Sequence, residues 1–502
     1  MPVLRLRLSA ALACLLAAGA LPVHAQSLVE LYEAARGYDA TYRAALAQYD
    51  ANLAKAAQSK AGILPSVGLT AGASSSQQEI RADGITLLRR GLPTQNAGIN
   101  ASQPLYRPAN WAAYQQGLRQ MDMAEAGLVL AGQDLVLRVS QAYFDVLSSQ
   151  DSLALVRQQK LGVAEQLASA QRNFEVGTAT ITDQREAQAR YDLVISQEIA
   201  AENDLQVKKI ALDQLVGRDG TQPVPLAAPV TLPTPQPATM DAWVLQAESG
   251  HPSIQQATLA LDVATLEVRR AEAGRLPTVD AQLGYNSTNN PSGTTTSTTT
   301  GRLQVNAASV GVVLNLPLFA GYAIENRLKE TLALQEQAHQ TLEATRRNVA
   351  LATRSAYLGL VSGAGQVKAL EAAEASSQSA LDANLLGYQV GVRINIDVLN
   401  AQSQLFQTKR DLALARYNVL LGDLKLRQAN GSLNADDLEA INATLALGPR
   451  ADAASAASPT QPSAATQSPV AVPADAPFER PMAPAGGVVP PPPRLVAPPA
   501  GK

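Results

Sequence analysis

The residues of this sequence best suited to chemistry are charged and aromatic side chains in a motif that occurs twice. FEVGTATITDQREAQ covers residues 174–188 and YQVGVRINIDVLNAQ covers residues 388–402, an offset of 214. The candidate functional residues of the two copies are Thr182, Asp183, Tyr388, Arg393, Asp397 and Asn400. The Arg393 guanidinium can bind a carboxylate through paired donors, and Asp183 is a natural partner for it. Copies of Asp397 around a symmetry axis would form an acidic ring, which attracts cations and can select or gate.

The same motif is also typical of a joint between two helices. Gly177 and Gly391 can supply the turn, because glycine adopts positive φ without steric cost. The residues that can cap the following helices are Thr182 and Asp183 in the first copy, and Asn395 and Asp397 in the second. For Asp183, a capping role and a functional role both remain open.

Motifs of the common enzyme classes are missing from the chain. After removal of the leader described below, two histidines remain, His251 and His339, and neither lies in an H-E-x-x-H pattern. The glycines at 363–365 lack the third glycine of a dinucleotide loop, because Lys368 occupies its place. We expect both histidines on the surface, no enzymatic activity, no cofactor and no metal site.

The N-terminal residues 1–25 have the parts of a secretory signal peptide. Arg5 and Arg7 form the basic region, residues 8–21 are apolar, and Val-His-Ala at 23–25 resembles a cleavage site. The apolar run is shorter than the roughly 20 residues of a spanning helix, which argues against a membrane anchor. Cys14 lies within this leader, in a context that does not fit lipidation. The exported chain therefore contains no cysteine for a disulfide or a thiolate metal site.

Charge and composition narrow the class of protein further. The formal net charge is −3 for 502 residues, which gives no general affinity for nucleic acid. Only 4% of residues are aromatic, and Ala, Leu and Gln are abundant, as in long, closely packed helices. No segment after the leader is typical of a transmembrane helix, so membrane insertion would require a β-barrel.

The chain also contains a duplicated unit of about 210 residues. AGILPSVGLTAGA at 61–73 is echoed by AGRLPTVDAQLGY at 273–285, and three further echoes share offsets of 213 or 214. The predicted segments are a signal peptide at 1–25, a first repeat at 26–216 with a β-hairpin at 66–106, a connector at 217–239, a second repeat at 240–429 with a β-hairpin at 278–319, a segment at 430–450 and a disordered Pro/Ala-rich tail at 451–502.

Each repeat contains helical stretches of very different lengths. The predicted helices cover 28–61, 109–174 and 182–216 in the first repeat, and 240–273, 322–388 and 396–429 in the second. At 1.5 Å per residue, the long helices reach roughly 100 Å and the short ones roughly 50 Å. Two short helices placed end to end match one long helix, which predicts a tube of antiparallel helices.

The strand segments alternate with period two, for example Val67 and Leu69 against Gly68 and Thr70. An apolar outer face and a small or polar inner face are typical of a transmembrane β-barrel, with long polar loops, here 75–95 and 287–302, outside the cell. Four strands cannot close a membrane barrel, so several subunits must combine. The predicted helix–strand junctions carry Pro65, Pro104, Pro277 and Pro317.

The second motif copy, together with LALARYNVL at 412–420 and ANGSLNADDL at 429–438, resembles the TolC family of outer-membrane efflux and secretion channels. The resemblance covers about 28–447. It implies a homotrimer in a Gram-negative outer membrane, with twelve strands in one barrel and twelve helices in a tunnel that extends into the periplasm. An equatorial belt would include parts of 218–244 and 431–447. The fold class is thus α+β, a long helical barrel that continues into a β-barrel.

The resemblance also implies roles for the motif residues. Tyr388 and Arg393 correspond to links that close the tunnel by reaching Asp183 and Thr182, and Asp397 corresponds to an aspartate ring. The family's next aspartate is replaced by Asn400, which removes charge from a second ring. A double acidic lock and strong block by multivalent cations are therefore in doubt.

The function implied is passive export through a duct in contact with outer-membrane lipid. Energy would come from an inner-membrane pump of the RND, ABC or MFS type, recruited through a periplasmic adaptor. Drug efflux and type I protein secretion share this sequence pattern, because selectivity lies largely in the pump. The alternative from a different class is a structural envelope protein with helical stalks and no through-passage.

Overall fold

The computed structural model describes residues 26–227, 232–293, 301–443 and 445. The predicted signal peptide and the predicted Pro/Ala-rich tail therefore lie outside the described residues. Among the described helices, none combines the length and the apolar character needed to cross a membrane.

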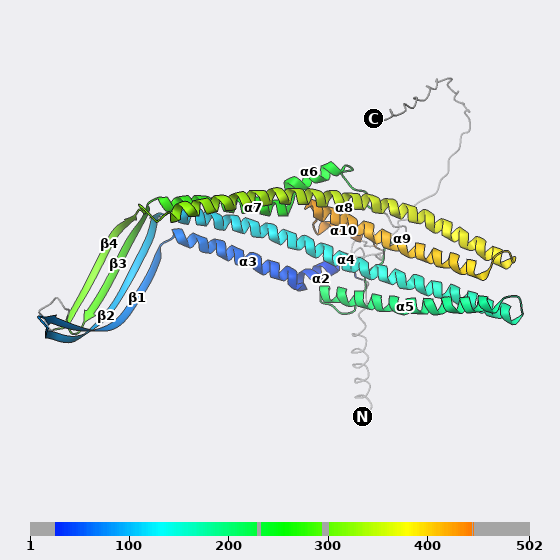
Figure 1. The fold of residues 1–502 in the computed structure, drawn as a ribbon, viewed down its shortest axis with the longest axis horizontal. Coiled ribbons are helices and arrows are strands. Elements are labelled where there is room, and N and C mark those ends of the chain that lie inside the picture. The colour runs from blue at the N-terminus through cyan, green and yellow to red at the C-terminus, as the bar shows by residue number, and fades with distance from the viewer. Residues whose placement is uncertain (1–25, 228–231, 294–300, 444, 446–502) are drawn as a thin grey trace, which may run out of the picture. The chain divides into compact units, whose positions relative to one another are not determined.

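The same order of elements occurs twice along the chain, which confirms the predicted repeat. The first set is α2 (Leu28–Tyr38), α3 (Ala40–Lys60), β1 (Ser66–Ala82), β2 (Ile85–Tyr106), α4 (Pro108–Glu175) and α5 (Ile181–Val216). The second set is α6 (Met240–Gly250), α7 (Pro252–Glu272), β3 (Thr278–Asn290), β4 (Leu303–Asn315), α8 (Ala323–Gln389) and α9 (Asn395–Asn430), followed by α10 (Asp436–Asn442). Figure 1 shows the sheet at one end of α4 and α8, and the turns into α5 and α9 at the other end.

Each predicted helix at 28–61 and 240–273 is in fact two helices. The first break is at Asp39, whose Oδ1 accepts a hydrogen bond from the Tyr42 N–H at 2.7 Å and so caps α3. The second break is at His251, which precedes Pro252 at the start of α7. A proline disfavours helical geometry in the residue before it, so α6 ends here.

The four strands form one antiparallel sheet in the order β1-β2-β3-β4. The pairing of β2 with β3 joins the repeats, with Ile99 opposite Tyr285. The predicted loop at 75–95 is wrong, because β1 and β2 continue to pair as far as Ala82 and Ile85. Asp83 and Gly84 form the turn with φ of 51° and 81°, the two-residue hairpin signal that the sequence analysis missed.

The junction prolines do not all occupy equivalent positions. Pro65 and Pro277 directly precede β1 and β3, and Pro317 lies between β4 and α8. Pro104 instead lies inside β2, where the pairing with β3 shifts register before Tyr106. Such a bulge tolerates the missing N–H of proline.

An ion pair ties the two repeats together at this end of the helices. The Arg107 Nε and Nη2 atoms donate to the Asp280 Oδ1 and Oδ2 atoms at 2.7 and 2.6 Å. Arg107 directly precedes α4, and Asp280 is a buried residue near the start of β3. This bidentate geometry fixes the first strand of the second hairpin relative to α4.

The helices bury their apolar side chains in successive clusters along α4 rather than in one central core. The largest cluster includes Tyr143, Phe144 and Tyr417, with the Phe144 and Tyr417 ring centroids 5.8 Å apart. The Tyr417 hydroxyl donates to Asp151 Oδ2 at 2.6 Å. Burial raises the pKa of the Asp151 carboxyl, whereas the hydrogen bond from Tyr417 lowers it.

The pair Asp151 and Tyr417 predicts a pH-dependent contribution to stability. Because the pKa of the Asp151 carboxyl is raised in the folded protein, this group contributes most to the free energy of unfolding in acid. The contribution falls as pH rises through the folded pKa. The substitution Tyr417→Phe removes the donor that stabilises the carboxylate. We expect a loss of about 1–2 kcal/mol near pH 7 and a smaller loss near pH 4, measured by thermal unfolding in detergent.

The matched control is Tyr49→Phe, which changes a half-buried tyrosine of α3. An equal loss of stability for Tyr417→Phe at both pH values would contradict the proposed hydrogen bond from Tyr417 to the Asp151 carboxylate.

Candidate functional site: the two helix turns

The duplicated motif forms two turns of the same geometry. One joins α4 to α5 and the other joins α8 to α9. Gly177 and Gly391 have φ of 79° and 80°, a conformation that costs a residue with a Cβ about 1–2 kcal/mol. The Thr178 N–H donates to the Asn173 carbonyl at 2.8 Å, and the Val392 N–H donates to the Gly387 carbonyl at 2.9 Å.

The two turns differ in how they start the next helix. The cap of α5 is Thr180, whose hydroxyl accepts from the Asp183 N–H at 3.2 Å. The Asp183 carboxylate accepts in return from the Thr180 N–H at 3.0 Å, which completes a capping box. Thr182 is exposed in the first turn of the helix and does not cap it.

The predicted caps of the second turn are wrong. The residue at the N-cap of α9 is Ile394, which provides no side-chain hydrogen bond. Asn395 is buried within the helix, and neither its amide oxygen nor its amide nitrogen has a partner among the described residues. Asp397 lies in the first turn of α9, where a negative charge favours the helix dipole.

The predicted gating residues lie close to these turns. The Arg393 Nη1 and Asp397 Oδ2 atoms are 3.6 Å apart and join the exposed Arg393 of the turn to the half-buried Asp397 of α9. The Tyr388 hydroxyl oxygen accepts from Asn173 Nδ2 at 3.1 Å, so it joins the second turn to the end of α4. Within the described chain, Asp183 is held by its capping box, and the link from Tyr388 and Arg393 to Asp183 and Thr182 stays a prediction.

Two contacts near the turns were not anticipated from the sequence. Asn173 directly precedes the first motif copy, and Arg190 follows it by two residues. The Arg190 Nη2 atom donates to Asn400 Oδ1 at 2.8 Å, which joins α5 to α9. The neutral Asn400 side chain is therefore hydrogen-bonded to a cation. Only proximity in the fold reveals such contacts, because the partners are about 210 residues apart in the chain.

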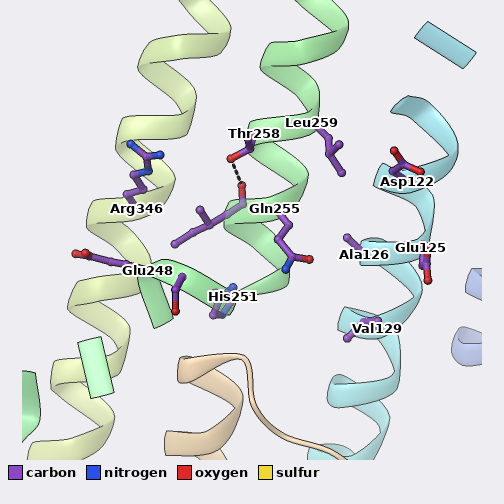
Figure 2. Close-up of a pocket in the computed structure, with 12 residues that line it drawn as sticks. Asp122, Glu125, Ala126, Val129, Glu248, His251, Gln255, Thr258, Leu259 and Arg346 are labelled. Atoms are coloured by element: carbon purple, nitrogen blue, oxygen red, sulfur yellow. Dashed lines mark hydrogen bonds between the residues drawn. The ribbon is translucent and has the colours of Figure 1, made fainter. Parts of the chain in front are cut away.

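A larger cavity lies away from the turns, between α4, α6, α7 and α8, with a volume of about 610 Å³. Figure 2 shows Asp122 and Glu125 on α4, on one side of α7, and Glu248 and Arg346 on the other side of α7. His251 also lines it, and its Nδ1 accepts from the Ser253 N–H at 3.0 Å. Burial lowers the pKa of His251, so its imidazole is neutral and serves as a helix cap.

The expectation that both histidines are on the surface is therefore wrong for His251, which is buried, whereas His339 is exposed. In the part of the chain that the structure describes, no cluster of three or more His, Cys, Asp or Glu residues is arranged to bind a metal.

The repeated pairs of long and short helices and the four-stranded sheet define a protein of the outer-membrane channel class. The sequence matches the model of the outer membrane efflux protein family over residues 31–218 and 243–432, which correspond to the two repeats. The chain belongs to this family, and its location is the outer membrane.

Sequence relatives support this assignment over most of the chain. It is 33% identical to outer membrane protein TolC of Vibrio cholerae, covering 84% of this chain and 94% of the relative. It is 30% identical to outer membrane protein TolC of Escherichia coli, covering 84% and 85%. It is 29% identical to alkaline protease secretion protein AprF of Pseudomonas aeruginosa, covering 84% and 88%. These relatives are transport proteins rather than enzymes; the absence of enzymatic activity in this chain stays a prediction.

The solved structure of the outer membrane protein VceC from Vibrio cholerae has the same fold. Its TM-score is 0.70 at 20% identity, covering 80% of this chain and 96% of that chain. The predicted fold class is thus confirmed.

The positive φ of the second turn gives a test of its geometry. The substitution Gly391→Ala adds a Cβ in a left-handed conformation, and we expect a loss of about 1–2 kcal/mol in thermal stability together with faster amide exchange at the turn. The control Gly37→Ala lies in helical geometry in α2, with open space around its Cβ, and it should stabilise slightly. Equal stability of the two variants would contradict the assigned turn conformation.

Proposed function

We propose that three copies of this chain form a closed duct across the outer membrane and the periplasm. The observation that carries the proposal is the sheet order, in which β1 and β4 each pair with one strand and leave an edge open. Open sheet edges are not tolerated in lipid, so the edges must pair between subunits. Twelve strands from three chains close one barrel, and the long helices of the same chains continue it as a tunnel.

The duct carries out no chemistry, and its transport is passive. Export requires energy from an inner-membrane pump of the RND, ABC or MFS type, coupled through a periplasmic adaptor. The relatives include both a protease secretion protein and the outer membrane efflux protein BepC of Brucella suis. Both type I secretion and drug efflux are therefore within the proposed function.

The turns form the closed periplasmic end of the proposed duct. Tyr388 and Arg393 hold the second helix pair, α8 and α9, against Asp183 and Thr182 of the first pair. The Asp397 side chains of three subunits form an acidic ring. The next position along α9 is the neutral Asn400, bound to Arg190, which supports a single ring rather than two.

Single-channel recording in planar bilayers tests both the duct and its closed end. We expect the purified protein to conduct weakly, and the double substitution Tyr388→Phe with Arg393→Ser to raise the conductance, because it removes the proposed links. The control is Tyr49→Phe with Arg43→Ser on α3, remote from the turns.

Two results would contradict this proposal. Unchanged conductance in the Tyr388 and Arg393 variant would reject the lock. No conductance in any form of the protein would favour the non-conducting stalk instead.

The substrate class requires an experiment in cells. Deletion of the gene, followed by measurement of drug sensitivity and of the secreted proteins, separates the two kinds of export. Greater drug sensitivity with an unchanged secreted profile supports efflux, and loss of a secreted protein with unchanged sensitivity supports secretion.

A further inference from the structure

A small cavity of about 110 Å³ lies between α4, α5 and α9, near the turns. Its apolar wall includes Val163, Val194 and Leu399, all almost fully buried. The volume corresponds to a few water molecules, at about 30 Å³ each, and is large enough for one small oxyanion.

The polar lining of this cavity is dominated by hydrogen-bond donors and positive charge. Its polar members include Gln159, Arg190, Gln197, Ser403 and Arg410, and no aspartate or glutamate is among the lining residues. The two arginines come from α5 and α9, so the cavity places cations from different repeats against one space.

Neither guanidinium is neutralised by a carboxylate in the part of the chain described. Arg190 donates to the neutral amide oxygen of Asn400, and Arg410 donates to the neutral amide oxygen of Gln407. By contrast, Arg157 on α4 pairs with Glu198, and Arg416 on α9 pairs with Glu371. The Arg190 and Arg410 charges therefore remain available to a ligand.

The carboxylate nearest to Arg410 in sequence, Asp411, does not neutralise the Arg410 guanidinium. Asp411 follows Arg410, but its Oδ1 accepts from Gln407 Nε2 at 2.8 Å, and Asp411 does not line the cavity. Asn400, which accepts a hydrogen bond from Arg190 near the cavity, is uncharged and leaves the Arg190 charge in place.

We propose that this cavity is a binding site for a small tetrahedral oxyanion, inorganic phosphate or sulfate, held by Arg190 and Arg410. Guanidinium groups bind such anions through paired, charge-assisted hydrogen bonds. The buried apolar wall strengthens these bonds by lowering the local dielectric. Ser403, Gln159 and Gln197 supply neutral donors that complete the shell.

A bound anion joins α5 of the first repeat to α9 of the second, close to the turns. It therefore favours the arrangement in which the two helix pairs lie together. If the protein is a channel, a bound anion therefore opposes its opening. This effect rests on the proposed channel function, whereas the binding site itself does not.

The test is calorimetric titration of the purified, detergent-solubilised protein with sodium sulfate and with sodium phosphate, in a chloride buffer of low ionic strength. We expect saturable binding to the wild type and binding about tenfold weaker or more in Arg410→Gln. Asn400→Asp should also weaken binding, because the new carboxylate neutralises Arg190 while conserving the size of the side chain.

The matched control is Arg416→Gln, which removes an arginine of α9 that already has a carboxylate partner and should leave binding unchanged. Absence of saturable binding to the wild type would overturn the site. Equal affinity in the wild type, Arg410→Gln and Asn400→Asp would also overturn it. Retention of the subunit assembly on size-exclusion chromatography excludes misfolding as the cause of a loss.

A recording in planar bilayers tests whether the bound anion affects channel opening. Replacing chloride by sulfate should lower the open fraction of the wild type more than that of Arg410→Gln, and an equal response in both would overturn the link to opening. If the protein gives no conductance in either salt, the channel function fails, while the titration still decides the site.

Discussion

The structure depends on lateral packing along α4, a helix of 68 residues. At roughly 100 Å, it is too long for a single core to cover it. Its first half contacts α3 and α7, as in the hydrogen bond from Gln116 to the Val263 carbonyl. Its second half contacts α5 and α9 through Ser149 with Asp204 and Asp151 with Tyr417. The short helices must therefore follow one another along α4, and this requirement fixes the order of elements in each repeat.

The two repeats are similar in backbone and different in the chemistry of their turns. In the first turn, the capping box of Thr180 and Asp183 provides hydrogen-bond acceptors for backbone N–H groups at the start of α5. The second turn has no side-chain cap, and it buries the Asn395 amide without a partner among the described residues, a costly arrangement. The start of α9 therefore has fewer side-chain hydrogen bonds than the start of α5.

The arginines near the turns differ in the charge of their neighbours. Arg393 lies beside Asp397, and Arg190 lies beside the neutral Asn400. Arg190 and Arg410 then contribute positive charge that no described carboxylate balances. The neutral side chain of Asn400 bears on both the proposed acidic ring and the proposed anion site, because it accepts a hydrogen bond from Arg190 without neutralising its charge.

The sequence by itself determined the duplication, the lengths of the long helices, the two hairpins and the turn glycines. These features depend on local periodicity and on the residues that end a helix or a strand. Both are encoded by residues that are close together in the sequence. Only the tertiary structure decided that His251 is buried, and that Asn173 and Arg190 meet Tyr388 and Asn400. These contacts join residues far apart in the chain or depend on burial. Their energies arise from which surfaces pack together, and no local pattern of residues encodes that choice.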